Sequence, residues 1–135
     1  MPCMLIIAGV DLSIDEPREI DLIPDSTWEK GSPRIPSRPS GKLNSDAGAK
    51  YFVSDADFDD FDVQKTDAIS FLLKNEKRIK ALMKIPSVES ATLDFGISRR
   101  DVAAQFDYFQ PELVRIAGKL GLGLELSQYS INDDE

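Results

Sequence analysis

Five aspartates lie within eight consecutive residues of this chain and form its densest group of potentially reactive side chains: Asp55, Asp57, Asp59, Asp60 and Asp62. Carboxylate oxygens are the ligands that Mg²⁺ and Ca²⁺ prefer, and a row of carboxylates also attracts basic proteins. The EF-hand calcium pattern fails, because Asp60 stands where that loop has glycine and Thr66 where it has its bidentate glutamate. A solvated acidic turn with Phe58 and Phe61 as core anchors is the structural alternative.

The chain contains no histidine and a single cysteine, Cys3. Ser-His-Asp and Cys-His nucleophile activation, HExxH zinc sites and imidazole acid–base catalysis all need a histidine. An enzyme of this composition would depend on carboxylates, lysine, tyrosine or a hard metal ion. We therefore expect a protein without catalytic residues, and the sequence indicates no cofactor.

The net charge of −8 and the pI near 4.5 disfavour nucleic acid as a partner. Charge is nevertheless segregated along the chain. Residues 32–50 and 64–86 are net basic, whereas residues 1–31, 51–63 and 87–135 are net acidic. Because an acidic body repels phosphate and attracts cationic surfaces, the composition favours a basic protein as partner.

Several features of the sequence indicate where the protein works. It has no run of about 18 apolar residues, so we expect no transmembrane span and no membrane partner. The first residues, MPCMLIIAGVDL, lack a basic n-region and a small-residue cleavage site, which argues against a secretory signal. A single cysteine excludes an intrachain disulfide and suits a reducing compartment. We therefore expect a cytoplasmic protein.

A long amphipathic helix is predicted from Thr66 to Ile85, with the other elements packed on its apolar side. Its apolar residues recur at three- and four-residue spacings: Ala68, Ile69, Leu72, Leu73, Ile79, Leu82 and Met83. Thr66 is the expected N-cap, and Pro86 ends the helix by disfavouring helical geometry in the residue before it. Its cationic residues form either a solvated face or a contact surface for an acidic partner or a second copy: Lys74, Lys77, Arg78 and Lys84.

The other segments predict a sheet and two further helices. Residues 91–97 alternate most clearly between apolar and polar side chains, and residues 3–8 indicate an interior strand covered on both sides. Residues 102–108 are expected to return as an antiparallel partner of 91–97. The remaining expected elements are strands over 26–30, 51–53 and 122–126, a short helix carrying Pro17 with Ile20 and Ile23 buried, and a helix from Pro111 to Leu120 with Gly121 at C′.

Residues 31–50, GSPRIPSRPSGKLNSDAGAK, are rich in glycine, serine and proline and predict a long loop. Pro33, Pro36 and Pro39 repeat with the period of a polyproline II helix, beside Arg34 and Arg38. This spacing permits a ligand for an SH3-like groove, but a flexible basic loop is the favoured interpretation because such loops are far more common.

These elements predict one α+β domain over residues 1–131, followed by an acidic tail over 132–135. We expect a mixed, largely antiparallel sheet of about five to six strands, with about three helices packed mainly on one face and some ferredoxin-like character.

Three segments together resemble a family of small bacterial domains of unknown function: GVDLSIDE, WEKGS and QPELVRIAGKLGLGLELSQYS. Members of the family that the chain resembles typically have a Gly-x-Asp-Leu step into a short helix, an aromatic-x-Lys-Gly turn and a leucine-rich helix leading to a last strand. The matching positions are Gly9, Asp11, Leu12, Trp28, Lys30, Gly31, Leu113, Leu120 and Tyr129. The resemblance implies a role as an immunity protein in a bacterial toxin system. The Pro-rich 31–50 segment and Pro17 depart from the family pattern.

Two functional hypotheses follow. The first is a non-catalytic immunity-type binding protein that neutralises a basic toxin, or another basic protein, with Trp28 and Phe58 as apolar anchors beside the five aspartates. The second is a hydrolase or sensor that holds Mg²⁺ or Ca²⁺ with the same carboxylates. The sequence leaves open whether the protein is a monomer or a homodimer.

Overall fold

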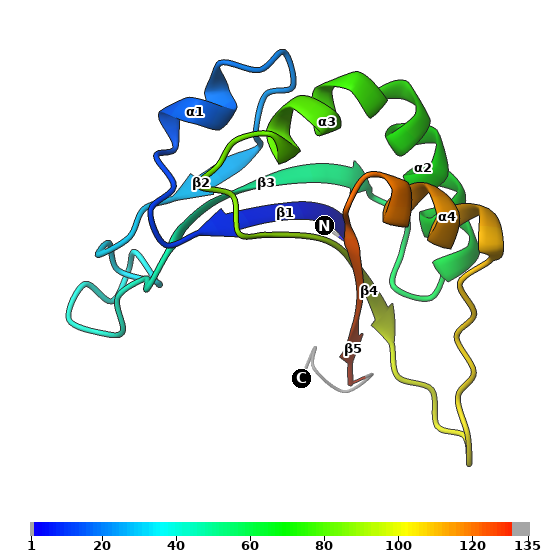
Figure 1. Cartoon of the computed structure of the whole chain (residues 1–135). Coiled ribbons are helices and arrows are strands. Elements are labelled where there is room, and N and C mark those ends of the chain that lie inside the picture. The colour runs from blue at the N-terminus through cyan, green and yellow to red at the C-terminus, as the bar shows by residue number, and fades with distance from the viewer. Residues whose placement is uncertain (1, 131–135) are drawn as a thin grey trace.

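The computed structural model describes residues 2–130 and confirms the predicted α+β class. Within this range, five strands form one sheet, and four helices accompany it (Figure 1). The elements in chain order are β1 (Cys3–Gly9), α1 (Asp15–Arg18), β2 (Ser26–Trp28), β3 (Ala47–Ser54), α2 (Phe61–Lys74), α3 (Glu76–Met83), β4 (Ser90–Ser98), α4 (Pro111–Lys119) and β5 (Gly123–Tyr129). The acidic tail expected over 132–135 lies outside the described residues.

The sheet has the order β2-β3-β1-β4-β5. β1 is its central strand and pairs antiparallel with both β3 and β4, and β2 pairs antiparallel with β3. β5 instead runs parallel to β4, since α4 lies between them in the chain and carries it back to the starting end of β4. The expected mixed and largely antiparallel sheet is therefore confirmed.

The helices lie over one face of the sheet, and the opposite face, called the uncovered face below, has no helical layer from residues 2–130 (Figure 1). In β1, Cys3, Leu5 and Ile7 point toward the helices and are buried, whereas Met4 and Ile6 point to the uncovered face and are half-buried. Our expectation that this strand is covered on both sides was therefore wrong. Its apolar residues on the second face form a half-buried surface.

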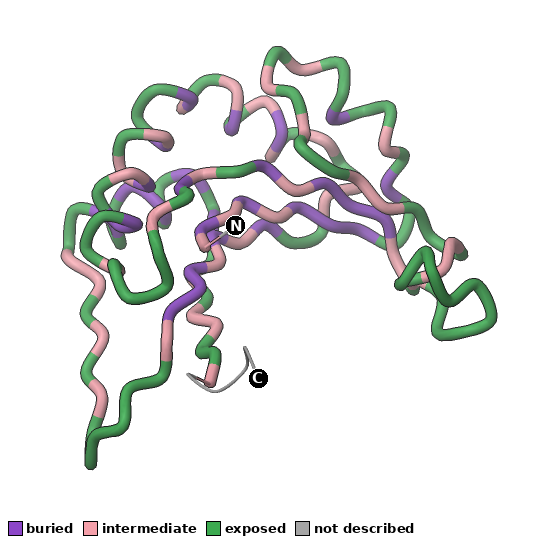
Figure 2. The backbone as a smooth tube through the Cα atoms, turned by 180° about the vertical axis from the view of Figure 1, so that it is seen from behind, coloured by how far each residue is buried: buried purple, intermediate pink, exposed green. Residues whose placement is uncertain are grey.

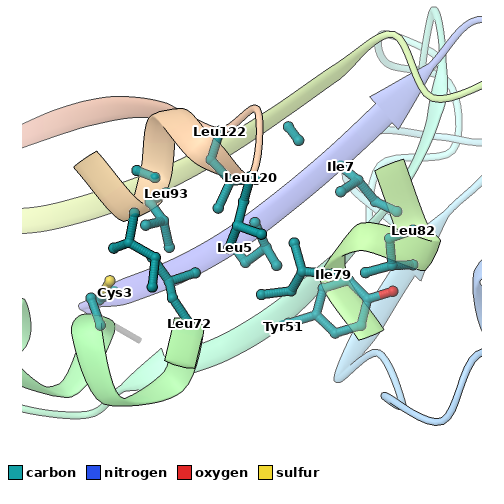
Figure 3. Packing of buried hydrophobic residues seen from close by; sticks show 14 of the residues in the cluster. Cys3, Leu5, Ile7, Tyr51, Leu72, Ile79, Leu82, Leu93, Leu120 and Leu122 are labelled. Carbon is teal, nitrogen blue, oxygen red and sulfur yellow. The ribbon is translucent and has the colours of Figure 1, made fainter. Parts of the chain in front are cut away.

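The core fills the space between the sheet and the helices (Figures 2 and 3). β1, β3 and β4 contribute Leu5, Tyr51 and Leu93 to it, and the helical layer contributes Leu72 and Ile79. Each of these side chains is essentially inaccessible to solvent. The apolar pattern of the sequence therefore identified most of the residues on which this packing depends.

The single long helix predicted from Thr66 is wrong at its start and in its middle. α2 begins at Phe61, and its N-cap is Asp60, whose side chain accepts a hydrogen bond from the Val63 amide. The helix breaks at Asn75, where the buried side-chain amide donates to the Phe71 carbonyl. Asparagine favours such local bonds over continued helix.

Not all of the apolar residues predicted for the inner side of this helix reach the core. Leu72, Ile79 and Leu82 are buried as predicted. Leu73 was expected on the same side but is 58% exposed.

The antiparallel strand predicted over 102–108 is absent, and residues 99–110, called the 99–110 loop below, extend away from the sheet beyond the end of β4 (Figure 1). The physical reason is that β4 has no free edge. β1 pairs with one side of β4 and β5 with the other, so a hairpin partner has no place in the sheet.

The first half of the chain differs in detail from our expectations. β2 ends at Trp28, two residues early, and β3 begins at Ala47, so the predicted 31–50 loop is shorter than expected and includes one antiparallel bridge between Pro33 and Leu43. The short helix is confirmed with Pro17 buried inside it. Ile20 packs partly against the core, but Ile23 is exposed.

The second half agrees more closely. α4 begins at Pro111, and Gly121 follows it with a φ of +78°, as expected for a C′ glycine. The last strand is longer than predicted and runs to Tyr129. Across residues 2–130, no helix has the length and apolarity needed to cross a bilayer.

Candidate functional site

The acidic segment, residues 55–62, connects the end of β3 to the first turn of α2. Its backbone is fixed at both sides: the Ser98 amide donates to the Phe58 carbonyl at 2.9 Å, and Gln64 Nε2 donates to the Asp57 carbonyl at 3.0 Å. Gln64 is fully buried and also donates to the Gly96 carbonyl at 2.8 Å. Gln64 therefore ties the acidic segment to β4 and holds its side chains at one corner of the sheet.

The five aspartates divide into two groups. Asp60 accepts the capping bond from the Val63 amide at 3.4 Å, and Asp62 lies 3.3 Å from Lys65 Nζ. The side chains of Asp55, Asp57 and Asp59 are exposed and make no hydrogen bond or ion pair with any residue in the described part of the chain. These three carboxylates are therefore available to a partner, whereas the other two also have local structural roles.

The carboxylates do not converge on a common point. Within residues 2–130, no three acidic or cysteine side chains are placed to hold a metal ion together. The metal hypothesis therefore has no assembled ligand set in the described part of the chain.

Phe58 lies on the uncovered face, where its ring meets that of Tyr129 edge-to-face with centroids 5.2 Å apart. Both rings lie over Gly96, and a Cβ on that glycine would stand 3.1 Å from Phe58 Cε1 and 3.2 Å from Tyr129 Cε2. The absence of a side chain at Gly96 lets the pair sit on the sheet. Phe58 is nevertheless 44% exposed and Tyr129 46% exposed, so the pair presents aromatic surface to solvent.

Phe61, the other expected core anchor, packs inward. Its ring lies edge-to-face against Phe95 at 5.7 Å and against Phe109 at 5.4 Å. The alternative interpretation of the acidic segment, a turn anchored by two core phenylalanines, is therefore correct for Phe61 and wrong for Phe58.

Trp28 also lies on the uncovered face, but it belongs to β2 at the opposite edge of the sheet from Phe58. Its indole covers Gly48, Nε1 donates to Asp46 at 2.9 Å, and Lys50 Nζ lies 5.8 Å from the ring centroid. Trp28 is therefore half-buried among local partners. The structure brings Phe58 and the aspartates together and leaves Trp28 apart from them.

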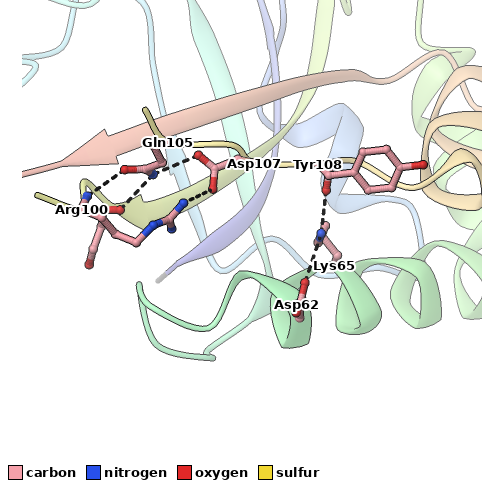
Figure 4. A network of polar contacts seen from close by, with 7 residues as sticks. Asp62, Lys65, Arg100, Gln105, Asp107 and Tyr108 are labelled. Atoms are coloured by element: carbon pink, nitrogen blue, oxygen red, sulfur yellow. Dashed lines mark hydrogen bonds and ion pairs between the residues drawn. The ribbon is translucent and has the colours of Figure 1, made fainter. Parts of the chain in front are cut away.

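The sequence interpretation missed the 99–110 loop as part of this corner (Figure 4). Arg100 and the nearly buried Asp107 form an ion pair at 3.3 Å, and Gln105 Nε2 donates to the second Asp107 oxygen at 2.9 Å. Phe106, which lies between Gln105 and Asp107 in the loop, is 86% exposed. The only available signal in the sequence was the aromatic pair Phe106 and Tyr108. Because these two residues alternate with the polar Gln105 and Asp107, they resemble part of a strand.

Lys65 fastens this loop to α2. Its side chain is buried, its Nζ donates to the Tyr108 carbonyl at 2.6 Å, and the ammonium group lies 4.3 Å from the centroid of the Phe61 ring (Figure 4). The loop and the acidic segment together line a hollow of about 340 Å³ that includes Asp59 and Phe106. The corner thus combines a concave surface, unpaired carboxylates and exposed aromatic rings.

Burial disfavours ionisation of two potential nucleophiles, Cys3 and Tyr51. Burial raises the pKa of the Cys3 thiol, and the nearby charges of Asp94 and Asp67 raise it further, so the thiolate is disfavoured. Burial also raises the pKa of Tyr51 to about 12.

No protein-family model, curated protein or solved structure matches this chain.

Proposed function

We propose that this protein is a non-catalytic binding protein that captures a basic protein at the corner formed by the acidic segment. One observation carries the proposal. Asp57 and Asp59 flank the exposed Phe58 in the chain, and their carboxylates, like that of Asp55, have no partner among residues 2–130. Phe58 contacts Tyr129, and Gln64 and the Ser98 amide fix this segment to the end of β4.

Charge and aromatic surface supply different parts of binding. Long-range attraction from a net charge of −8 steers a cationic surface toward the protein and raises the association rate. Desolvated aromatic side chains then slow dissociation, because rings at the centre of interfaces contribute most of the affinity. Phe58 and Tyr129 have the position and exposure for this second role.

The partner class that fits best is a basic toxin domain, and the protein would then be its immunity protein in the bacterial cytoplasm. The sequence resemblance suggests this role, and the charge is compatible with it. Toxins that act on nucleic acids carry basic surfaces, and an acidic inhibitor that covers such a surface blocks substrate access without chemistry.

The test is co-purification with the product of the neighbouring gene, at low and at high salt, using two triple variants of equal net charge. The first neutralises the corner by Asp55→Asn, Asp57→Asn and Asp59→Asn. The matched control neutralises exposed acids elsewhere by Asp11→Asn, Glu19→Gln and Glu29→Gln. We expect the corner variant to weaken binding at least about tenfold and the control to have a small effect. Equal losses in both variants would show that only net charge matters and would remove the corner from the proposal.

A further inference from the structure

β5 forms one edge of the sheet, and the backbone polar groups of three of its seven residues point outward. The Arg99 amide donates to the Tyr129 carbonyl at 2.7 Å, which shows that the backbone groups of Tyr129 face β4. Because these groups alternate in direction along a strand, those of Leu124, Leu126 and Gln128 face away from the sheet. In residues 2–130, these outward amides and carbonyls have no hydrogen-bond partner.

The two edges of the sheet differ in how well they resist pairing with another chain. β2 is only three residues long, and a short edge strand offers little to pair with. β5 has seven residues, GLELSQY, with no proline and no lysine, and its register with β4 is unbroken. Glu125 is its only charged residue, so it has few of the usual protections of an exposed edge.

The side chains at this edge define what kind of strand would fit. On the uncovered face, Glu125 is exposed and lies next to Asp94 in the register, and Ser127 Oγ donates to Asp94 at 2.6 Å. On the helix side, Leu124 and Leu126 are only partly buried. An added strand would therefore place cationic side chains beside Glu125 and apolar side chains beside the leucines.

We propose that the partner adds an extended segment of alternating cationic and apolar residues to the β5 edge. This inference rests on the proposed function and specifies how the basic partner is held. β5 ends at Tyr129, whose ring contacts Phe58, so a strand added there continues directly into the acidic corner. Backbone bonds would supply affinity, and the alternating side chains would supply specificity.

Charge distinguishes this occupant from a second copy of the chain. Pairing β5 with another β5 would bring two more carboxylates, Glu125 and Asp94 of the second copy, to an edge that is already acidic. Each copy also carries a net charge of −8. A basic segment instead meets attraction at every one of these positions.

The experiment measures binding of a nine-residue peptide of alternating lysine and valine to two variants of the full chain. Gln128→Pro removes an outward amide while leaving the bonds of Ser127 and Tyr129 to β4, and proline is tolerated on sheet edges. Gln128→Thr keeps the amide and the net charge and is the matched control. A block peptide of the same composition, with all its lysines before its valines, controls for charge alone.

We expect Gln128→Pro to weaken binding of the alternating peptide about tenfold relative to Gln128→Thr, and the block peptide to bind both variants weakly and equally. Equal binding of the alternating peptide to both variants, or none to the wild type, would overturn strand addition. So would a dimer of the free protein that Gln128→Pro dissociates. If partner capture persists in Gln128→Pro, strand addition is overturned while the proposed function stays intact. If capture is lost only in the variant that neutralises Asp55, Asp57 and Asp59, the proposed function is supported without strand addition.

Discussion

The Tyr51 hydroxyl is a buried polar group without a hydrogen-bond partner among residues 2–130. Its ring extends from β3 into the core beside Ile79 and Leu82 (Figure 3), and the residue is 1% exposed. No residue in the described range accepts or donates a hydrogen bond at this oxygen. A buried hydroxyl left unpaired costs about 1–3 kcal/mol of stability.

Removing that hydroxyl should therefore stabilise the fold. We expect Tyr51→Phe to raise the free energy of unfolding by about 1 kcal/mol at pH 7, measured by urea denaturation. Tyr51→Ala, which removes the ring as well, should lower it by about 3–5 kcal/mol because it leaves a cavity. A lower stability of Tyr51→Phe would show that the hydroxyl has a partner, such as a buried water.

The raised pKa of Tyr51 predicts that the stability of the fold depends on pH in the alkaline range. Burial raises the Tyr51 pKa from 10.0 to about 12, so above pH 10 the unfolded chain loses this proton more readily than the folded one. This difference leaves the free energy of unfolding unchanged below pH 10. Between pH 10 and pH 12 it lowers the free energy of unfolding by at most about 1.4 kcal/mol per pH unit.

Alkaline denaturation series should resolve this contribution. Because the raised pKa of Cys3 acts in the same direction, both proteins should carry Cys3→Ala. The stability of the protein that retains Tyr51 should then fall more steeply between pH 10 and 12 than that of the Tyr51→Phe protein. Parallel curves would contradict the assignment.

At the scale of elements, the aspartates near the start of α2 differ in role, since some support the structure and others are available to a partner. Asp60 caps the helix, so Asp60→Ala should lower the free energy of unfolding by about 1 kcal/mol. Asp59 has the same charge and no bond, so Asp59→Ala should change stability by less than about 0.5 kcal/mol. Thermal denaturation of both variants tests this, and equal effects would contradict the capping role.

The 99–110 loop depends on Lys65 for its attachment to α2. Lys65→Met keeps most of the buried side-chain volume but removes the donor to the Tyr108 carbonyl. The loop should then open more often, and trypsin should cleave faster after Arg99 and Arg100, which are exposed in the loop. Cleavage rates followed by mass spectrometry test this.

The matched control is Lys74→Met, which removes an exposed lysine from the same helix without affecting the loop. Cleavage after Arg115 in α4 provides an internal reference in each digest. Unchanged loop cleavage in Lys65→Met would mean that the Arg100–Asp107 network holds the loop alone.

The local pattern of apolar and polar residues predicted the elements that face the core. It failed where contacts between distant segments determine the structure. The alternation of 91–97 predicted β4, and the proline at the first position of the helix predicted the start of α4. The alternation of 102–108 was equally clear, but no sequence pattern reveals that both sides of β4 are already paired. Likewise, Phe58 and Phe61 look alike in the sequence, and the space that the Phe58 ring occupies outside the core is left by Gly96, on a strand distant in the sequence.

At the scale of the whole molecule, a one-sided layer of helices leaves an apolar sheet face without cover. Met4 and Ile6 are half-buried there, and Phe52 beside them on β3 is 44% exposed. A net charge of −8 opposes contact between two such faces at neutral pH. Charge therefore protects a surface that the fold leaves open.

That protection should fail near the pI of about 4.5, where the net charge approaches zero. We expect the protein to self-associate there, as measured by light scattering, because apolar faces then meet without repulsion. Phe52→Gln should reduce the scattering, since it makes the centre of the uncovered face polar and leaves the core intact. Leu73→Gln, at a still more exposed apolar position on the helical side, should leave it unchanged. If Leu73→Gln were the more effective variant, the helical side and not the sheet would be the surface through which uncharged molecules associate.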